Sequence, residues 1–366
     1  MRTPRIVLFG ATGFTGRLTA AALIARGARP LLAGRDPARL EAFAASLAVR
    51  PPTAVADVTR PESLCKIVGP GDVLISAVGP FMRWGEVAVM AATEAGAVYL
   101  DTAGEPPFIK RIFQRYGPAA GAGGAALITA FGYDYVPGNL AAALALRKAG
   151  SEAVRVDVGY FVRGDLAGRL SPGTRASALG ILLEPMYGFR EGRIVHEHGR
   201  TRAFLVGGRR RYGIAVGTSE HFALPPAHPG LREVNVYLGW LGRFTRAAGT
   251  LARARPVLAT LPGARRVTDA LADRVMRAGR SPVPAGPAVS SQIIAEAYDA
   301  RGRLLAAVEL DGADPYDFTA RILAWGATTA LAEGVSGTGA LGPVDAFGLE
   351  ALTRACADAG LAAQTR

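Results

Sequence analysis

The sequence predicts an α/β protein that begins with a doubly wound parallel sheet and continues into a second domain of mixed α+β type. Three observations lead to this fold class. Short apolar runs alternate with helical patterns from residue 5 to residue 130. A glycine-rich turn separates the first run from the first helix. The alternation then stops near Pro137, and strand candidates separated by Gly and Pro follow.

Each element of the first domain has a local signal. The predicted strands are short apolar runs, namely Arg5–Phe9, Pro30–Ala33, Thr53–Ala56, Asp72–Val78, Val98–Leu100 and Ala126–Ala130. The predicted helices between them are Thr15–Ala28, Pro37–Leu47, a short helix near Pro61–Val68, Gly85–Ala95 and Phe108–Tyr116. Asp36 is a suitable N-cap, with Pro37 in the first turn of the helix that follows. This spacing predicts right-handed βαβ crossovers.

The second domain is predicted to mix helices and strands. Its helices are Asn139–Lys148, Gly173–Arg190, the helix-rich segment Trp240–Ala278, Tyr316–Ala332 and Asp345–Ala359. Its strands are Ala153–Val162, Arg193–His198, Phe204–Leu205, Tyr212–Ala215, Val234–Tyr237, Gln292–Ala297 and Leu304–Leu310. The last two form a hairpin around residues 299–302, with a loop longer than two residues.

Composition narrows the functional class. The 366 residues are half apolar and one-fifth charged, as in a globular protein. The net charge of +12 comes from scattered arginines, so no nucleic-acid module is expected. Cys65 and Cys356 stand far apart, and His196 and His198 have no acid or cysteine at ligand spacing, so no metal is expected either.

No leader or transmembrane segment is predicted, which makes a cytoplasmic location the expectation. The arginine-rich segment Trp240–Ala278 leaves peripheral membrane contact open as an alternative to a solvated helix face.

The glycine-rich turn has the form of a phosphate-binding loop. It reads Gly10-Ala-Thr12-Gly13-Phe14-Thr15-Gly16 and lies between a buried strand and a helix. Glycines allow the backbone to approach a pyrophosphate, and the helix N-terminus offers free N–H groups. The spacing differs from G-x-G-x-x-G, but the strand–turn–helix context is the one that this motif requires. The alternative is an ordinary βα turn.

The end of the second strand predicts NADP(H). NAD sites place an acid there, whereas this chain has Gly34 and Arg35, which leave room for a 2′-phosphate and pair with its charge. Asp57 and Val58, after the third strand, are candidates for cofactor binding; Asp57 could accept a hydrogen bond from the adenine amino group, and the alternative for it is an N-cap. The segment Ala77-Val78-Gly79, after the fourth strand, is expected beside the ribose and nicotinamide.

Two further strand ends carry polar groups. Asp101 and Glu105 follow the fifth strand, and Tyr133-Asp134-Tyr135 follow the sixth. Such ends converge on the ligand crevice of an open α/β sheet, where an acid or a phenol can donate a proton. Capping of turns and helices explains Asp101 and Asp134 equally well, so both interpretations stay open.

These motifs, taken in order, resemble a known family. The residues are Gly10–Gly16, Gly34-Arg35, Ala77–Phe81, Tyr99–Glu105, Gly132–Pro137, Ser171–Thr174 with Ser177, and Gly337–Gly360. Together they are similar to the saccharopine dehydrogenase-like NADP-binding oxidoreductases, in particular the trans-acting enoyl reductase branch. The resemblance implies a Rossmann domain formed by residues 1–138 and 338–366, an inserted α+β substrate or dimerisation domain at 139–337, and a last helix that returns to the first domain.

One motif differs from the family pattern. The family motif after the sixth strand reads more like G-F-D-S-V-P, whereas this chain has Tyr133 and Tyr135 at the second and fourth positions. These phenols predict a proton donor or an altered pocket, with Tyr135, Tyr133, Asp134 and Glu105 as the candidate catalytic residues.

Three functions remain open at this stage. The first is an NADPH-dependent reductase that delivers hydride to an activated C=C of an apolar or natural-product small molecule. The second is imine or carbonyl reduction, and the third is NADP(H) binding without turnover. A homodimer is compatible with each of them.

Overall fold

The computed structural model describes residues 3–164, 186–240 and 289–363, together with Gly242, Thr245, Gly249 and Thr250. Most of the predicted helix Gly173–Arg190 and of the helix-rich segment Trp240–Ala278, with the serine motif at 171–177, therefore lies outside the described residues. The contacts within the chain form two compact units. Unit 1 comprises Met1–Ala103, Phe108–Val136 and Pro315–Gly360, and unit 2 comprises Gly104–Pro107, Pro137–Asp314 and Leu361–Arg366.

A seven-stranded parallel sheet forms the centre of unit 1, with the order β15-β6-β5-β4-β1-β2-β3. Its strands are β1 (Ile6–Phe9), β2 (Leu31–Gly34), β3 (Thr53–Val55), β4 (Val73–Ser76), β5 (Val98–Asp101), β6 (Ala126–Ile128) and β15 (Gly339–Ala340). All six strands predicted for the first domain are confirmed. The seventh, β15, pairs with β6 after the chain returns from unit 2, which confirms the completion of the sheet implied by the resemblance.

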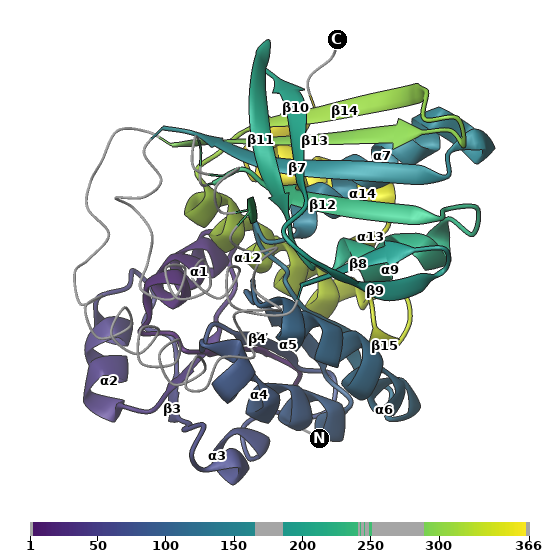
Figure 1. Cartoon of the computed structure of the whole chain (residues 1–366). Coiled ribbons are helices and arrows are strands. Elements are labelled where there is room, and N and C mark those ends of the chain that lie inside the picture. Colours follow the sequence, from purple (N-terminus) through teal and green to yellow (C-terminus); the bar gives the residue numbers. More distant parts are fainter. Residues whose placement is uncertain are drawn as a thin grey trace, which may run out of the picture. The chain divides into compact units, whose positions relative to one another are not determined.

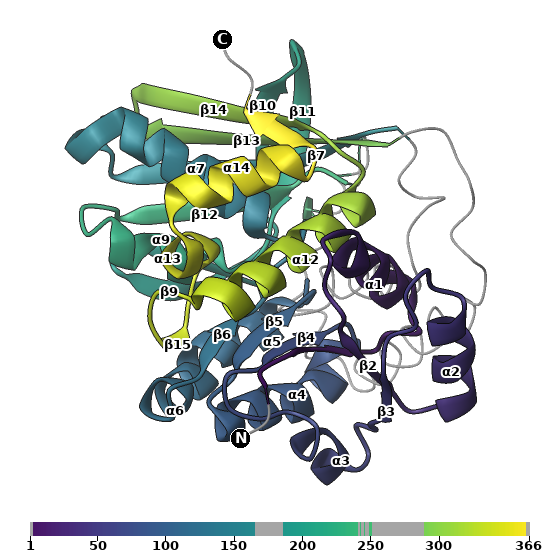
Figure 2. The same ribbon diagram turned by 180° about the vertical axis from the view of Figure 1, so that it is seen from behind.

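Helices cover both faces of this sheet. The described α-helices of unit 1, with α5 beginning in unit 2, are α1 (Phe14–Ala25), α2 (Pro37–Ala45), α3 (Pro61–Cys65), α4 (Phe81–Ala95), α5 (Pro106–Arg111), α6 (Gly117–Ala122), α12 (Pro315–Glu333), α13 (Pro343–Phe347) and α14 (Leu349–Asp358). Of these, α3, α4 and α6 lie on one face (Figure 1), whereas α1 and α12 lie on the other (Figure 2). The predicted cap is present, because Asp36 accepts a hydrogen bond from the backbone N–H of Arg39 at 3.0 Å.

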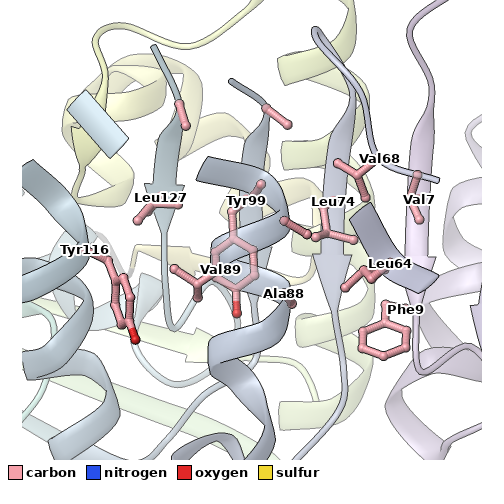
Figure 3. Packing of buried hydrophobic residues seen from close by; sticks show 14 of the residues in the cluster. Val7, Phe9, Leu64, Val68, Leu74, Ala88, Val89, Tyr99, Tyr116 and Leu127 are labelled. Atoms are coloured by element: carbon pink, nitrogen blue, oxygen red, sulfur yellow. The ribbon is translucent and has the colours of Figure 1, made fainter. Parts of the chain in front are cut away.

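The buried face toward α4 explains why the strands stay paired. Val7 of β1, Leu74 of β4, Tyr99 of β5 and Leu127 of β6 point to the same side of the sheet, where Val89 of α4 packs against them (Figure 3). Removing this apolar area from water stabilises the sheet by roughly 25 cal/mol per Å². The continuous apolar runs in the sequence follow from burial on both faces.

Unit 2 contains a mixed sheet of nine described strands, in which β10-β11-β12-β7-β13-β14-β16 are neighbours and β8 and β9 extend from β12. The strands are β7 (Arg155–Arg163), β8 (Met186–Arg190), β9 (Arg193–Glu197), β10 (Thr201–Val206), β11 (Arg209–Ala215), β12 (Glu233–Leu238), β13 (Ser290–Tyr298), β14 (Leu304–Gly312) and β16 (Leu361–Ala363). Its longer described helices are α7 (Val136–Ala149), which begins at the last residue of unit 1, and α9 (Glu220–Ala227).

The predicted hairpin at 292–310 is confirmed as the antiparallel pair β13 and β14. Three differences from the sequence prediction are informative. Met186–Arg190 was expected at the end of a helix and instead forms β8, because it pairs with β9 and β12. Helix α9 was not predicted, since Pro225 and Pro226 lie inside it. The predicted last helix is divided into α13 and α14 at Gly348, whose φ is +77°.

The described chain returns to unit 1 at Pro315, earlier than the proposed residue 338, because α12 packs along α1. The last helix, α14, belongs to unit 1, as the resemblance implied. Strand β16, which follows it, pairs with β14 of unit 2.

Candidate functional site

The loop after β1 is a tight backbone cradle. Gly10 has φ +85°, and its N–H and that of Ala11 donate to the carbonyl oxygen of Ala33 at 2.9 and 3.2 Å. A Cβ on Gly16 would overlap the carbonyl oxygen of Gly10, so the first turn of α1 approaches the loop as closely as only glycine permits. This close approach fits the pyrophosphate of a dinucleotide, which needs the same exposed backbone.

The N-terminus of α1 is suited to an anion. Gly13 is its N-cap and has no side chain that could occupy the first N–H groups, and the first turn contains no acidic residue. Phosphate oxygens therefore meet unblocked N–H donors and a favourable helix dipole. Phe14 lies beside this terminus and contacts Tyr316 of α12 edge to face, with ring centroids 5.0 Å apart. Nothing local in the sequence connects Tyr316 with residue 14, so this contact was not predicted.

Positive charge gathers at the end of β2. Arg35 is exposed there, next to Gly34, and Arg60 lies in the segment after β3. Hydrogen bonds from the backbone N–H and the hydroxyl of Thr59 lower the pKa of the Asp57 carboxyl, and the charges of Arg60 and Arg35 lower it further. Two guanidinium groups thus act on one small region, which suits a 2′-phosphate.

Asp57 forms a local turn with Thr59 at 2.9 Å and is not the N-cap of α3, which is Arg60. The N-cap alternative for Asp57 is therefore wrong. Its neighbour Val58 packs against the apolar core of unit 1.

The segment after β4 lies directly beside the glycine loop. The N–H of Ala77 donates to the carbonyl oxygen of Phe9 at 2.9 Å. A Cβ on Gly10 would lie 2.8 Å from the side chain of Val78 and 3.0 Å from the Ala77 carbonyl oxygen. The structure therefore brings Gly10, Ala77 and Val78 together at the carboxyl edge of the sheet, and Gly79 follows next in the chain. These are the positions expected to border the nicotinamide half of the cofactor.

Asp101 braces the loop that follows β6. Its buried carboxylate accepts hydrogen bonds from the N–H of Ala103 at 2.9 Å, the N–H of Ala130 at 2.7 Å and the hydroxyl of Thr129 at 2.8 Å. Ala130 has φ +58°, a strained backbone conformation for an alanine. Of the two interpretations left open for Asp101, the structural one accounts for its contacts: it joins the ends of β5 and β6 and holds the strained turn.

Helix α12 holds the same loop from the other side. The hydroxyl of Thr319 accepts a hydrogen bond from the N–H of Tyr133 at 3.0 Å, and it donates to the carbonyl oxygen of Pro315 at 2.7 Å. Phe131 packs against Phe347, with ring centroids 5.3 Å apart. Helices α12 and α13, which follow the return of the chain to unit 1, therefore contact and stabilise the segment Ala130–Val136.

The three polar residues of this loop have different surroundings. Tyr133 and Tyr135 are buried, with 3% and 1% of their surface exposed. Asp134 is half-buried, and among the described residues its Oδ1 has no hydrogen-bond partner. Burial raises the pKa of Asp134 to about 7. Glu105, the fourth candidate, is buried in unit 2.

Within the described residues, no group of His, Cys, Asp and Glu is arranged to hold a metal ion. No described helix is long and apolar enough to cross a membrane.

Comparison with known proteins agrees with this geometry. Residues 6–128 match the family described as the saccharopine dehydrogenase NADP binding domain. A Mycobacterium tuberculosis protein, named provisionally as a trans-acting enoyl reductase, is 39% identical over 191 residues, which cover 49% of this chain and 45% of that protein. The trans-acting enoyl reductase of Mycobacterium ulcerans is 39% identical over 140 residues, which cover 37% of this chain and 34% of that protein.

The chain thus spans less than half the length of these relatives. The fold is shared with apo saccharopine dehydrogenase (L-Glu forming) from Saccharomyces cerevisiae, with a TM-score of 0.61 and 14% identity over 99% of this chain and 100% of that chain. The match therefore identifies residues 6–128 as an NADP(H)-binding domain, and the chain shares the fold of saccharopine dehydrogenase.

Proposed function

We propose that the protein is an NADPH-dependent reductase that adds hydride to an activated carbon–carbon double bond of an apolar small molecule. The relatives named as trans-acting enoyl reductases support this reaction class. The half-apolar composition is compatible with an apolar substrate.

The observation that carries the proposal is the acid in the loop after β6. In a parallel sheet the carboxyl ends of β1, β4 and β6 lie at one edge, so Asp134 belongs to the edge that carries the glycine loop. A carboxyl with a pKa of about 7 is substantially protonated at neutral pH and can donate a proton.

The chain's own residues have distinct tasks in this proposal. The loop Gly10–Gly16 and the first turn of α1 hold the pyrophosphate, and Arg35 pairs with the 2′-phosphate. Bound NADPH supplies the hydride, as an electron pair and a proton together. When the substrate's β-carbon has accepted this hydride, the α-carbon carries the negative charge as an enolate. Asp134 then protonates the α-carbon, so one C=C becomes one saturated bond and NADP⁺ remains.

Asp134 fits the donor role better than the two phenols. Tyr133 and Tyr135 are buried, whereas Asp134 as a residue keeps part of its surface exposed. A phenol has an ordinary pKa near 10, which makes it a weaker acid than a carboxyl at about 7. We therefore assign proton donation to Asp134 and the shape of the surrounding loop to Tyr133 and Tyr135.

A substrate screen tests this function. Oxidation of NADPH is followed with enoyl thioesters, cyclic imines and ketones, using the wild type, Asp134→Asn and Tyr135→Phe. We expect turnover of an enoyl thioester, a loss of at least 100-fold in kcat for Asp134→Asn, and unchanged NADPH affinity by calorimetry. Tyr135→Phe is the matched control within the loop and should lose less than tenfold.

Three results would contradict the proposal. Turnover of imines or ketones alone would replace it with imine or carbonyl reduction. No turnover of any class would favour a protein that binds NADP(H) without catalysis. A larger loss in Tyr135→Phe than in Asp134→Asn would return the donor role to the tyrosine.

A further inference from the structure

A buried hydrogen-bonded chain in unit 2 ends at the first turn of helix α7. The Tyr160 hydroxyl, on β7, donates to Oε1 of Glu220, on α9, at 2.7 Å. The same hydroxyl accepts a hydrogen bond from the backbone N–H of Gly138 at 2.8 Å. Glu220 and Tyr160 have no exposed surface. The order of donors is thus Gly138 N–H to Tyr160 to Glu220.

The packing around these hydrogen-bonded groups leaves no room for a side chain at residue 138. A Cβ on Gly138 would overlap both the Tyr160 hydroxyl and Oε1 of Glu220. Ser219 lies beside the carboxylate, with its hydroxyl 3.5 Å from Oε2 of Glu220, and it accepts a hydrogen bond from the Asn139 side-chain amide at 3.0 Å. Two consecutive residues of the first turn of α7 are therefore linked to the start of α9: Asn139 directly to the N-cap Ser219, and Gly138 through Tyr160 to Glu220.

Tyr160 and Glu220 together cap the N-terminus of α7, although neither residue belongs to that helix. The first N–H groups of a helix have no partner within the helix, and the N-terminus favours nearby negative charge. Glu220 supplies that charge through the polarised hydroxyl of Tyr160. Helix α7 begins at Val136, directly after Tyr135, so the helix start and the candidate loop Tyr133–Tyr135 are one continuous piece of backbone.

We propose that Glu220 and Tyr160 are positioning residues: by holding the N–H of Gly138, they set the start of α7 and thereby the conformation of the loop that carries Asp134. The role of that loop in proton transfer rests on the function proposed above. The hydrogen-bonded chain itself does not depend on it.

Glu220 also makes this cap sensitive to pH. Burial raises the pKa of Glu220 to about 7, although hydrogen bonds from Tyr160, Thr218 and Ser219 oppose the increase. Ionised Glu220 is the stronger acceptor for Tyr160, so the cap is strongest above about pH 7 and weakens below it.

The other titratable groups around Glu220 keep one charge state near neutral pH. Burial raises the pKa of Tyr187, on β8, well above its ordinary value, and it lowers the pKa of His221 to about 3. The charges of Arg200 and Arg190 lower the pKa of His221 further. Tyr187 and His221 are therefore both neutral at pH 7, and the change in charge falls on Glu220.

Nuclear magnetic resonance tests the hydrogen-bonded chain from Gly138 through Tyr160 to Glu220 without any assay of activity. The protein is labelled with ¹³C at the Cζ of its ten tyrosines, and Tyr160→Phe identifies the Tyr160 signal. In the wild type this signal should shift between pH 5.5 and 8.5 with a midpoint near 7. It should stay constant in Glu220→Gln, which keeps an acceptor oxygen and removes the charge. Glu152→Gln, at an exposed glutamate of unit 2, should behave as the wild type.

Hydrogen exchange followed by mass spectrometry tests the positioning of the loop. Peptides that cover residues 133–140 should exchange at least fivefold faster in Tyr160→Phe than in the wild type, while peptides of β1 and β4 should not change. Equal exchange of the 133–140 peptides, or a Tyr160 signal that titrates equally in Glu220→Gln, would overturn the proposal.

Kinetics then connect positioning with catalysis. On a substrate that the wild type reduces, Tyr160→Phe should lower kcat more than tenfold, with the KM for NADPH within twofold of wild type. In the wild type the weaker cap should lower kcat below pH 7 and oppose the gain from protonated Asp134, and this loss should be absent in Glu220→Gln. A wild-type kcat in Tyr160→Phe would overturn the effect on catalysis. If the wild type reduces no substrate, the proposed function fails, and the resonance and exchange measurements still decide the positioning role.

Discussion

The carboxylate of Asp101 accepts a hydrogen bond from the backbone N–H of Ala130 at 2.7 Å, across 29 positions of sequence. This bond joins the end of β5 to the first residue of the loop that carries Tyr133, Asp134 and Tyr135. Because Ala130 has φ +58°, its backbone needs support from a neighbour, and Asp101 provides it together with contacts to Ala103 and Thr129.

Replacing Asp101 should therefore affect both stability and activity. In Asp101→Asn an amide N–H₂ replaces one acceptor oxygen and faces N–H and hydroxyl donors. We expect a loss of about 2–4 kcal/mol in the free energy of unfolding, since buried donors lose their acceptor. The loop should also loosen, with at least a tenfold loss of kcat. Denaturant titration and NADPH oxidation measure the two effects.

Asp72 is the matched control for Asp101. It is also fully buried, and it accepts hydrogen bonds from the N–H of Arg5 at 2.9 Å and of Gly69 at 3.0 Å. It precedes β4, at the opposite edge of the sheet from the glycine loop. Asp72→Asn should lose similar stability with little change in kcat. An equal loss of kcat in both variants would show that instability alone accounts for the Asp101 effect.

Arg35 should determine the choice between NADPH and NADH. In Arg35→Gln a 2′-phosphate loses one guanidinium partner, so we expect the Kd for NADPH to rise by roughly 10- to 100-fold, as for a charge-assisted hydrogen bond of about 1.5–3 kcal/mol. The Kd for NADH should change less than threefold. Arg39→Gln, on α2, removes the same charge away from the strand end and serves as the control in calorimetry with both cofactors. Parallel weakening of both cofactors in Arg35→Gln would contradict a specific contact with the 2′-phosphate.

Gly16 should be essential for the cofactor loop. In Gly16→Ala the new methyl group would overlap the Gly10 carbonyl oxygen, so either the loop or α1 must move. We expect NADPH binding to weaken by more than 100-fold or to be lost, as calorimetry would show. Gly230→Ala adds a methyl group where no atom lies within 4 Å and should bind as wild type. Wild-type affinity in Gly16→Ala would mean that the pyrophosphate does not rest on this turn.

Because the pKa of Glu220 is raised in the folded protein, the free energy of unfolding should be lower at high pH. Its pKa rises from an ordinary 4.5 to about 7 in the folded protein. Below pH 4.5 the carboxyl is protonated in both the folded and the unfolded states. Between pH 4.5 and 7 only the unfolded state ionises, so the free energy of unfolding decreases as pH rises and then levels off above 7.

The measurement is the difference in the free energy of unfolding between Glu220→Gln and wild type. Relative to the wild type, the free energy of unfolding of Glu220→Gln should rise by about 3 kcal/mol between pH 4 and pH 8.5. This value follows from the shift of the Glu220 pKa from 4.5 to about 7, at roughly 1.4 kcal/mol per pKa unit. Glu152→Gln should show no such trend. A constant difference for Glu220→Gln across this range would mean that the carboxyl titrates normally in the folded state.

Local signals in the sequence were sufficient to predict the strands, the helix cap and the glycine turn of the nucleotide-binding part of the fold. The strands β1, β2, β4, β5 and β6 follow from short runs of mainly apolar residues, because a strand buried on both faces favours apolar side chains. The cap at Asp36 and the glycine turn follow from backbone requirements of one or two residues. The same local reasoning failed where contacts from elsewhere decided the outcome. Met186–Arg190 became β8 through pairing with β12, and α9 formed despite two prolines.

The sequence by itself was sufficient to predict the parallel sheet and the glycine loop, and Gly34 with Arg35 led to the prediction of NADP(H). The tertiary structure decided the roles of the polar residues. Asp101 and Ala130 are 29 positions apart, and Tyr160 and Glu220 are 60 apart, so periodicity could not connect either pair. The physical reason is that a carboxyl's role depends on the donors that surround it and on its burial. Both properties appear only when distant segments pack together.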